Sequence, residues 1–172
     1  NITQKDIELI MDLALNVPTR LIGDSLRLRQ ILINLLNNAF KFTDKGEIVL
    51  KINATHQENP QVHLDFNIRD TGIGIPPDKL ADIFKAFTQV DNSTSRKQDG
   101  SGLGLAISQN LVKMMGGGEI KVESSPDQGS TFSFSLPFEI GNSVDDAIPV
   151  LPKGLSNLKV LIVEDNRASQ IM

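Results

Sequence analysis

The chain has 172 residues, of which 40% are hydrophobic and 22% are charged, values that fit a folded globular domain plus a piece of another. Its net charge of −4 excludes a basic surface for a nucleic-acid backbone, so we expect no nucleic-acid partner. Cysteine is absent, which excludes disulfides and thiol catalysis, and no apolar run approaches the ~18 residues of a membrane span, so we expect no membrane contact.

The first third of the chain contains one clear helix. Residues 6–14 have an apolar pattern that fits either a strand or a short helix. Residues 25–42 are predicted to form a helix, because apolar residues recur every three or four positions and Asp24 is suited to cap the first turn. Gly46 is predicted to end this segment.

Strands and two further helices follow. Residues 48–53 and 62–69 are predicted to be strands, with 54–61 as their hairpin loop. Two prolines open a predicted helix over 76–87, and the polar segment 88–102 is predicted to be a mobile loop.

The next elements complete one domain. Residues 103–115 have the pattern of an amphipathic helix, stopped by three glycines. Residues 119–124 and 130–136 are predicted to be strands that a turn sequence joins. This order predicts an α+β fold of two layers, with helices on one face of a mixed, mostly antiparallel sheet.

The last part of the chain has a different character. The first domain is predicted to span 1–138, and residues 139–157 are predicted to be a linker, because they lack periodicity and are rich in Gly, Asn, Ser, Asp and Pro. Residues 158–172 begin with a continuous apolar run that ends in Glu164 and Asp165. Such a run is typical of a central parallel strand, so we expect a second domain that is cut inside its first strand.

Three motifs are candidates for chemistry. In the first, the predicted helix places Asn34, Asn38 and Lys41 on one flank. A carboxamide oxygen such as that of Asn38 can bind Mg²⁺, which takes few protein ligands besides water and phosphate, and Lys41 could meet phosphate charge. The alternative is a solvated polar helix face.

The second motif is Asp70–Pro76, which directly follows an alternating strand. Asp70 could accept a hydrogen bond from the exocyclic amine of adenine, and Gly72 and Gly74 would let the backbone approach a flat ring closely. The alternative is a plain Asp-Gly turn between a strand and a helix.

The third motif is Gly100–Leu105, where the polar loop meets a helix. Backbone N–H groups at a glycine-rich helix start bind anions. Leu105 stands where the dinucleotide fingerprint needs its third glycine, and no Gly-Lys-Ser/Thr of a P-loop follows. The alternative is a flexible hinge.

In this order, the motifs resemble those of the ATP-binding catalytic domain of sensor histidine kinases. This domain belongs to the ATPase superfamily of gyrase B, MutL and the ninety-kilodalton heat-shock chaperone, and the resemblance implies its Bergerat fold over about residues 5–138. The matching segments are Asn34–Thr43 for the N box, Asp70–Pro76 for the G1 box, Ile83–Phe87 for the F box and Gly100–Leu105 for the G2 box.

The resemblance implies a role for each matching residue, with ATP and Mg²⁺ as the cofactors. Asn38 would hold the Mg²⁺ that bridges the phosphates, Lys41 would contact phosphate, and Asp70 would recognise the adenine amine with help from Thr131. The residues expected to contact ATP are Asn34, Asn38, Lys41, Asp70, Gly72, Gly74, Ile75, Phe87, Arg96, Lys97, Gly100, Ser101, Gly102, Leu103, Gly104, Leu105 and Thr131.

The resemblance also implies an ATP lid over residues 88–101. Its Arg96 and Lys97 are candidates for reaching phosphate. Phe84 and Phe87 would anchor the base of the lid, and we expect both to pack in the core.

Asn34 bears on the type of reaction. Hydrolysing relatives carry a glutamate in this region of the helix, whereas the amide of Asn34 cannot be a general base at neutral pH. We therefore expect the domain to retain ATP for transfer of the γ-phosphoryl to a histidine. Neither His56 nor His63 lies in the family's phosphoacceptor context, so that histidine is expected on a dimerisation domain outside this chain.

Residues 158–166 resemble the first strand of a response-regulator receiver domain, with Glu164 and Asp165 as its acidic Mg²⁺ pair. The implied parent is a homodimeric hybrid histidine kinase, cytoplasmic in this portion, with a response regulator or phosphotransfer protein as partner. One alternative is a pseudokinase-like module that relays signals by docking, favoured by Asp99 in the lid. An ATP-driven clamp is a further alternative, which Asn34 disfavours.

Overall fold

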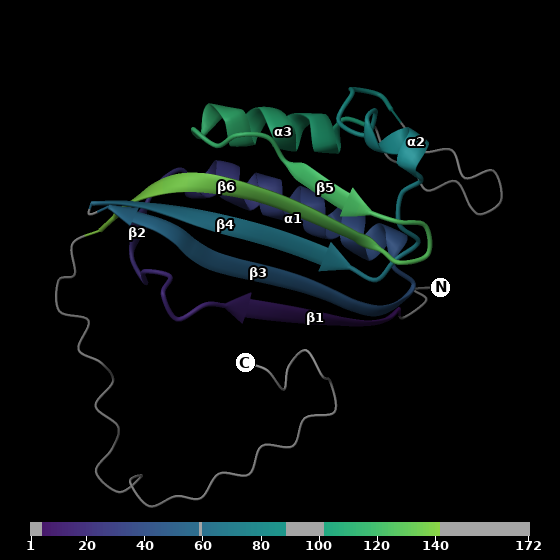
Figure 1. Cartoon of the computed structure of the whole chain (residues 1–172), viewed down its shortest axis with the longest axis horizontal. Helices are drawn as coiled ribbons and strands as arrows, with labels where there is room; N and C mark the ends of the chain where they lie inside the picture. The colour runs from purple at the N-terminus through teal and green to yellow at the C-terminus, as the bar shows by residue number, and fades with distance from the viewer. Residues whose placement is uncertain (1–4, 59, 89–101, 142–172) are drawn as a thin grey trace, which may run out of the picture.

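The computed structural model describes residues 5–58, 60–88 and 102–141, with only the backbone of His56 and Gln57. Two helices lie on one side of a curved sheet, and a short third helix lies at one end (Figure 1). The elements in chain order are β1 Asp6–Leu13, β2 Leu21–Ile22, α1 Ser25–Phe42, β3 Lys45–Glu58, β4 Gln61–Asp70, α2 Pro77–Leu80, α3 Gly104–Met114, β5 Lys121–Ser124 and β6 Ser130–Ile140.

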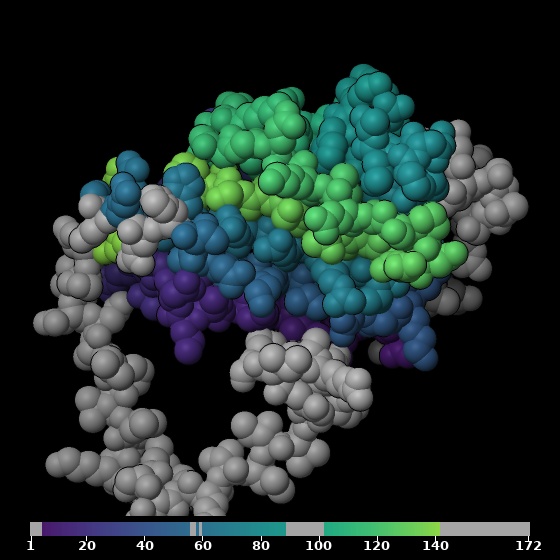
Figure 2. Space-filling model, in the orientation of Figure 1, coloured from purple at the N-terminus to yellow at the C-terminus, as the bar shows by residue number. Residues whose placement is uncertain are grey.

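The sheet has the strand order β1-β3-β4-β6-β2, and β5 pairs with β6. Among the described strands β1 and β3 run parallel, and every other pair is antiparallel. This confirms the predicted α+β fold with a mixed, mostly antiparallel sheet. In Figure 2, β1, β3, β4 and β6 follow one another from purple to green, below the atoms of α2 and α3.

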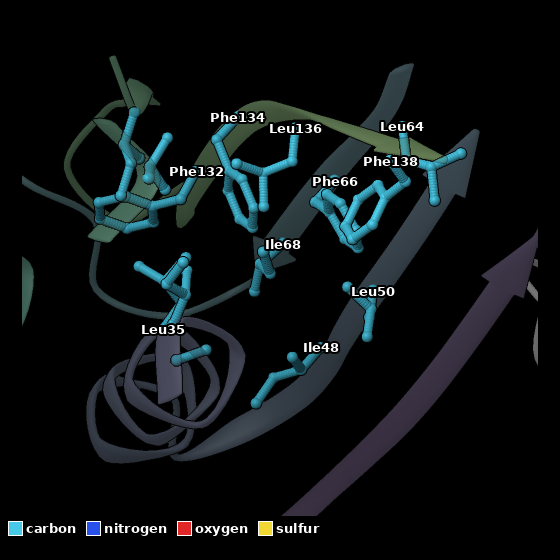
Figure 3. Packing of buried hydrophobic residues seen from close by; sticks show 14 of the residues in the cluster. Leu35, Ile48, Leu50, Leu64, Phe66, Ile68, Phe132, Phe134, Leu136 and Phe138 are labelled. Atoms are coloured by element: carbon cyan, nitrogen blue, oxygen red, sulfur yellow. The ribbon is translucent and has the colours of Figure 1, made fainter. Parts of the chain in front are cut away.

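The core lies between the sheet and the helices. Ile31, Leu35 and Ala39 of α1 are buried, and α1 packs on β3 and β4 while α3 packs on β6. Phe66 stacks on Phe134 with ring centroids 4.9 Å apart, and Figure 3 shows Leu35 directed at the same layer of strand side chains. Within the described residues, no helix combines the length and apolar character needed to cross a membrane.

The structure confirms the predicted helix over 25–42 and its cap. The Asp24 carboxylate accepts a 3.0 Å hydrogen bond from the backbone N–H of Arg27 in the first turn of α1. The prediction that Gly46 ends this segment was wrong, because α1 already ends at Phe42. Gly46 belongs to β3, where its φ of +120° permits close contact with Thr71.

Strand pairing resolves one open prediction and corrects the extent of others. The open choice for residues 6–14 resolves as strand β1, which is parallel to β3. The predicted loop over 54–61 was wrong: β3 continues to Glu58 and β4 begins at Gln61, with a register shift between Ala54 and His56. β6 likewise continues to Ile140, two residues beyond the predicted domain end at 138.

The predicted helix over 76–87 was wrong in extent, because only Pro77–Leu80 is helical. Beyond it the chain continues in tight turns with hydrogen bonds between residues three apart, and Phe87 has a φ of 64° that no helix tolerates. By contrast, α3 ends as predicted, with Gly116 at φ +83° and a hydrogen bond from the N–H of Gly117 to the carbonyl of Val112.

Candidate functional site

Asn34 links the two long helices. Its side-chain Nδ2 donates a 2.8 Å hydrogen bond to the Oγ of Ser108, a residue of α3 that is 1% exposed. A Cβ at Gly104 would lie 2.2 Å from Asn34 Oδ1, so a larger residue there would force the Asn34 side chain to shift. The N box and the start of α3 therefore meet at Asn34.

Asn38 and Lys41 continue the flank of α1 that Asn34 begins, and both are half-buried. The Lys41 ammonium lies 5.1 Å from the centroid of the Phe42 ring, a distance that suits a cation–π contact. Among the described residues, no group of three or more His, Asp or Glu side chains could hold a metal ion. Asn38 offers a carboxamide oxygen, a donor type that suits Mg²⁺, which takes few protein ligands besides water and phosphate.

Asp70 is a buried carboxylate at the end of β4, only 5% exposed. Its Oδ1 accepts a 2.9 Å hydrogen bond from the backbone N–H of Gly72, and the backbone N–H of Ser130 also donates to its carboxylate. Burial raises the pKa of Asp70, while these N–H groups and the nearby Arg69 oppose the rise. The result is a fixed hydrogen-bond acceptor in a dry surrounding.

The loop after Asp70 lies against α1 and against the turn between β5 and β6. The N–H of Ile73 donates to the carbonyl of Phe42 at 3.2 Å, which joins the G1 box to the end of α1. A Cβ at Gly72 would meet this carbonyl at 2.4 Å. Gly74, at φ +67°, lies against the carbonyl of Ser125 in the same way. Both glycines are thus required by close backbone contacts.

The pairing of β4 with β6 separates Thr131 from Asp70. Asp70 is opposite Ser130, whereas Thr131 is opposite Arg69. Directly opposed residues share a face, and neighbouring residues alternate, so Ser130 lies on the face of Asp70 and Thr131 lies on the other. Ser130 is 7% exposed and was not among the residues expected to contact ATP. Its even spacing from the inward Phe132 was the signal that could have found it.

The two ends of the predicted lid meet. The N–H of Phe87 donates a 3.1 Å hydrogen bond to the carbonyl of Gly102, and both residues have a positive φ. Phe84 is half-buried against the core, but Phe87 is 77% exposed, so the expected packing of Phe87 in the core was wrong. Its left-handed φ turns the chain away from the core before the side chain can pack.

The start of α3 can receive an anion. Leu103 precedes this 11-residue helix, and no side chain caps its first turn. The first N–H groups of a helix lack partners within it and attract negative charge. Leu105 and Ile75 of the G1 box are both half-buried, and their side chains pack against the hydrophobic core.

A cavity of about 450 Å³ lies between α1 and α3. Asn34, Gly104 and Ser108 belong to its wall, and Asp70 does not. Several predicted site residues lie outside the described part of the chain: Arg96, Lys97, Gly100, Ser101, Glu164 and Asp165.

Comparison with known proteins agrees with this geometry. Residues 23–140 match the family model "Histidine kinase-, DNA gyrase B-, and HSP90-like ATPase". Hybrid signal transduction histidine kinase F of Dictyostelium discoideum is 45% identical over 168 residues, which are 96% of this chain and 15% of that protein. Signal transduction histidine-protein kinase BarA of Escherichia coli is 41% identical over 165 residues, 96% of this chain and 18% of BarA. The chain thus spans less than a fifth of these relatives.

Solved structures show the same fold. The crystal structure of full-length ShkA in complex with AMPPNP has a TM-score of 0.64 and 38% identity, covering 80% of this chain and 27% of ShkA. The mycobacterial sensor histidine kinase MprB has a TM-score of 0.62 and 30% identity, covering 79% of this chain and 86% of the MprB chain. The sheet and helices are therefore those of histidine kinase catalytic domains.

Proposed function

The chain belongs to the family of histidine kinase-, DNA gyrase B- and HSP90-like ATPases, and from this we propose that it is the Mg·ATP-binding catalytic domain of a hybrid sensor histidine kinase. In this proposal the γ-phosphoryl group passes to a histidine on a dimerisation domain, and then to an aspartate of a receiver domain. The observation that carries it is the buried Asp70 carboxylate, held by two backbone N–H groups beside a glycine loop.

Asp70 would bind the adenine of ATP. A carboxylate accepts but does not donate at neutral pH, which fits the exocyclic amine of adenine and repels the carbonyl oxygen at that place in guanine. The close backbone contacts of Gly72 and Gly74, with the carbonyls of Phe42 and Ser125, hold the loop beside this carboxylate in place. Ser130, rather than Thr131, would be the β6 residue that assists Asp70 in binding adenine, because it shares the face of Asp70.

The phosphates would lie between α1 and the start of α3. The uncapped first turn of α3 offers N–H groups, and Lys41 offers a positive charge. Asn38 would hold Mg²⁺, which neutralises phosphate charge when bound. Arg96 and Lys97 of the lid remain candidates for the same phosphates.

Asn34 would suppress hydrolysis in this proposal. Its carboxamide is no base, and its Nδ2 is already used by Ser108, so it cannot activate a water molecule at neutral pH. The domain would therefore hold ATP until a histidine arrives, and positioning would supply most of the catalysis.

The proposed parent has further parts. The catalytic domain, predicted over 1–138, would extend to the end of β6 at Ile140, the remaining residues to 157 would be the linker, and 158–172 would be the start of the receiver, in which Glu164 and Asp165 would form the Mg²⁺ pair. The parent would be a homodimer, with this domain in the cytoplasm where ATP is available, and its partner would be a response regulator or a phosphotransfer protein. The names of the relatives, which are hybrid kinases, support this arrangement.

Calorimetric titration with a non-hydrolysable ATP analogue, with Mg²⁺ and with chelator, tests the proposal. We expect saturable, Mg²⁺-dependent binding in the parent. Asn38→Ala should lose the Mg²⁺ dependence, and Asp70→Asn should bind the analogue about tenfold more weakly. Asn110→Ala on the exposed side of α3 and Asp65→Asn on the other face of β4 are matched controls that should bind like the parent.

The outcomes separate the alternatives. Binding that neither variant changes would show that the site lies elsewhere. Binding without phosphoryl transfer, when the domain is supplied with the dimerisation domain of its own parent, would favour the docking module over the kinase. A steady ATPase rate that Asn34→Ala abolishes would favour the ATP-driven clamp.

A further inference from the structure

Three strands present one line of side chains behind the adenine-binding carboxylate. Ser124 of β5 is opposite Ser130 of β6, and Ser130 is opposite Asp70 of β4. Directly opposed residues of antiparallel strands point to the same face, so the three side chains follow one another across the sheet. Ser124 is the member of this line that neither the sequence motifs nor the proposed function involve.

The Ser124 hydroxyl has all its hydrogen bonds within this corner of the fold. Its Oγ donates to the carbonyl of Gly129 at 2.8 Å and accepts from the backbone N–H of Ile75 at 2.8 Å. The Oγ of Ser130 lies 3.0 Å away. A hydroxyl has one hydrogen, which Gly129 receives, so Ser130 is the donor in this third contact.

These bonds fix the two segments that hold the Asp70 carboxylate. Ser130 supplies one of the N–H groups on that carboxylate, and Gly72, in the loop that Ile75 ends, supplies the other. A second tie joins the same segments, from the N–H of Asp127 to the carbonyl of Ile73 at 2.8 Å. The Ser124 side chain thus contacts both segments through one hydroxyl.

We propose that Ser124 is a positioning residue for nucleobase recognition, which sets the direction of the Asp70 carboxylate through Ser130 and the Asp70–Pro76 loop. This inference rests on the proposed function, because it assumes that Asp70 binds adenine. Without the hydroxyl, the N–H of Ile75 and the carbonyl of Gly129 lose their partner. The Asp70–Pro76 loop and the turn between β5 and β6 can then move apart. Within the described residues, the hydrogen bonds of Ser124 go to Ile75, Gly129 and Ser130, and none goes to α1 or α3, which form the phosphate side of the proposed site.

The experiment compares affinities for non-hydrolysable analogues of ATP and GTP in the full chain, by calorimetry with Mg²⁺. In Ser124→Ala we expect the preference for the ATP analogue over the GTP analogue to fall by about tenfold, the effect of a lost and unsatisfied hydrogen-bond pair. Ser124→Thr keeps the hydroxyl and should restore the preference to within about twofold. Ser133→Ala, which removes a half-buried hydroxyl from β6 outside this line, should leave it unchanged.

Thermal melts of the same variants separate positioning from folding. A merely structural role of Ser124 would lower the melting temperature and weaken both analogues equally, and this result would overturn the inference. An unchanged preference in Ser124→Ala would overturn it as well. A parent protein without any preference for the ATP analogue would overturn the proposed function, and the inference with it.

Discussion

The side-chain nitrogen of Asn34 donates a 2.8 Å hydrogen bond to the hydroxyl of Ser108, and the side-chain oxygen of Asn34 lies against Gly104. One carboxamide therefore sets how closely the glycine-rich start of α3 approaches α1. In the proposed function, the spacing of the two helices sets how far the Mg²⁺ ligand Asn38 on α1 lies from the N–H groups of α3 that receive phosphate.

Gly104→Ala should destabilise the fold, because the new methyl group would overlap Asn34. We expect a loss of about 1–3 kcal/mol in the free energy of unfolding, measured by urea denaturation. Gly118→Ala is the matched control, since nothing lies within 4 Å of a Cβ at that glycine. Equal stabilities of the two variants would mean that Asn34 does not limit the approach of the helices.

The pKa of Asp70 gives a pH-dependent prediction. Because burial raises this pKa in the folded protein above its unfolded value, protonation favours the folded state. The contribution of Asp70 to stability is therefore fully present below the unfolded pKa and is lost as the pH rises through the folded pKa. Asp70→Asn removes this loss, so its stability relative to the parent should be higher at about pH 7 than at about pH 4. Denaturation at the two pH values measures it, and a difference that does not change with pH would contradict the assignment.

Two phenylalanines of opposite burial should respond differently to truncation. Phe66 is 2% exposed and stacks on Phe134, so Phe66→Ala should cost about 3–5 kcal/mol in the free energy of unfolding. Phe87 is 77% exposed, and Phe87→Ala should cost less than about 1 kcal/mol. Thermal and chemical denaturation compare them. A large loss in Phe87→Ala would show that this ring is buried after all.

Lys5 stabilises the C-terminal end of α1. Its ammonium donates to three carbonyls there, at 2.8, 3.1 and 2.8 Å, those of Phe40, Lys41 and Thr43. Lys5→Met should therefore cost about 1 kcal/mol, through lost hydrogen bonds and a lost charge at the negative end of the helix. Lys45→Met, which removes a lysine paired with the exposed Asp6, is the control and should have little effect. The prediction fails if both variants unfold at the same urea concentration.

Local sequence patterns correctly predicted the elements that depend on neighbouring residues. The stripe of α1 and the cap at Asp24 follow from neighbouring residues, and both are present. The extent of β3 and β4 was not predicted, since the polar residues beyond Ala54 are strand because they pair across the hairpin with the start of β4. The motifs made Asp70 a candidate, which stays a prediction, and the pairing of β6 with β4 was needed to place Ser130 rather than Thr131 on its face of the sheet.

The hydrogen bond between Phe87 and Gly102 has a consequence for how such a domain can diversify. Because Phe87 and Gly102 are hydrogen-bonded to each other, the segment between them begins and ends at one place in the fold. Doubling the length of a flexible insertion between fixed ends costs only about 0.6 kcal/mol. Residues can therefore be added, removed or exchanged there while the sheet, its helices and the Asp70 corner keep their stability. This position is a natural entry point for inserting a reporter or for grafting the corresponding segment of another kinase.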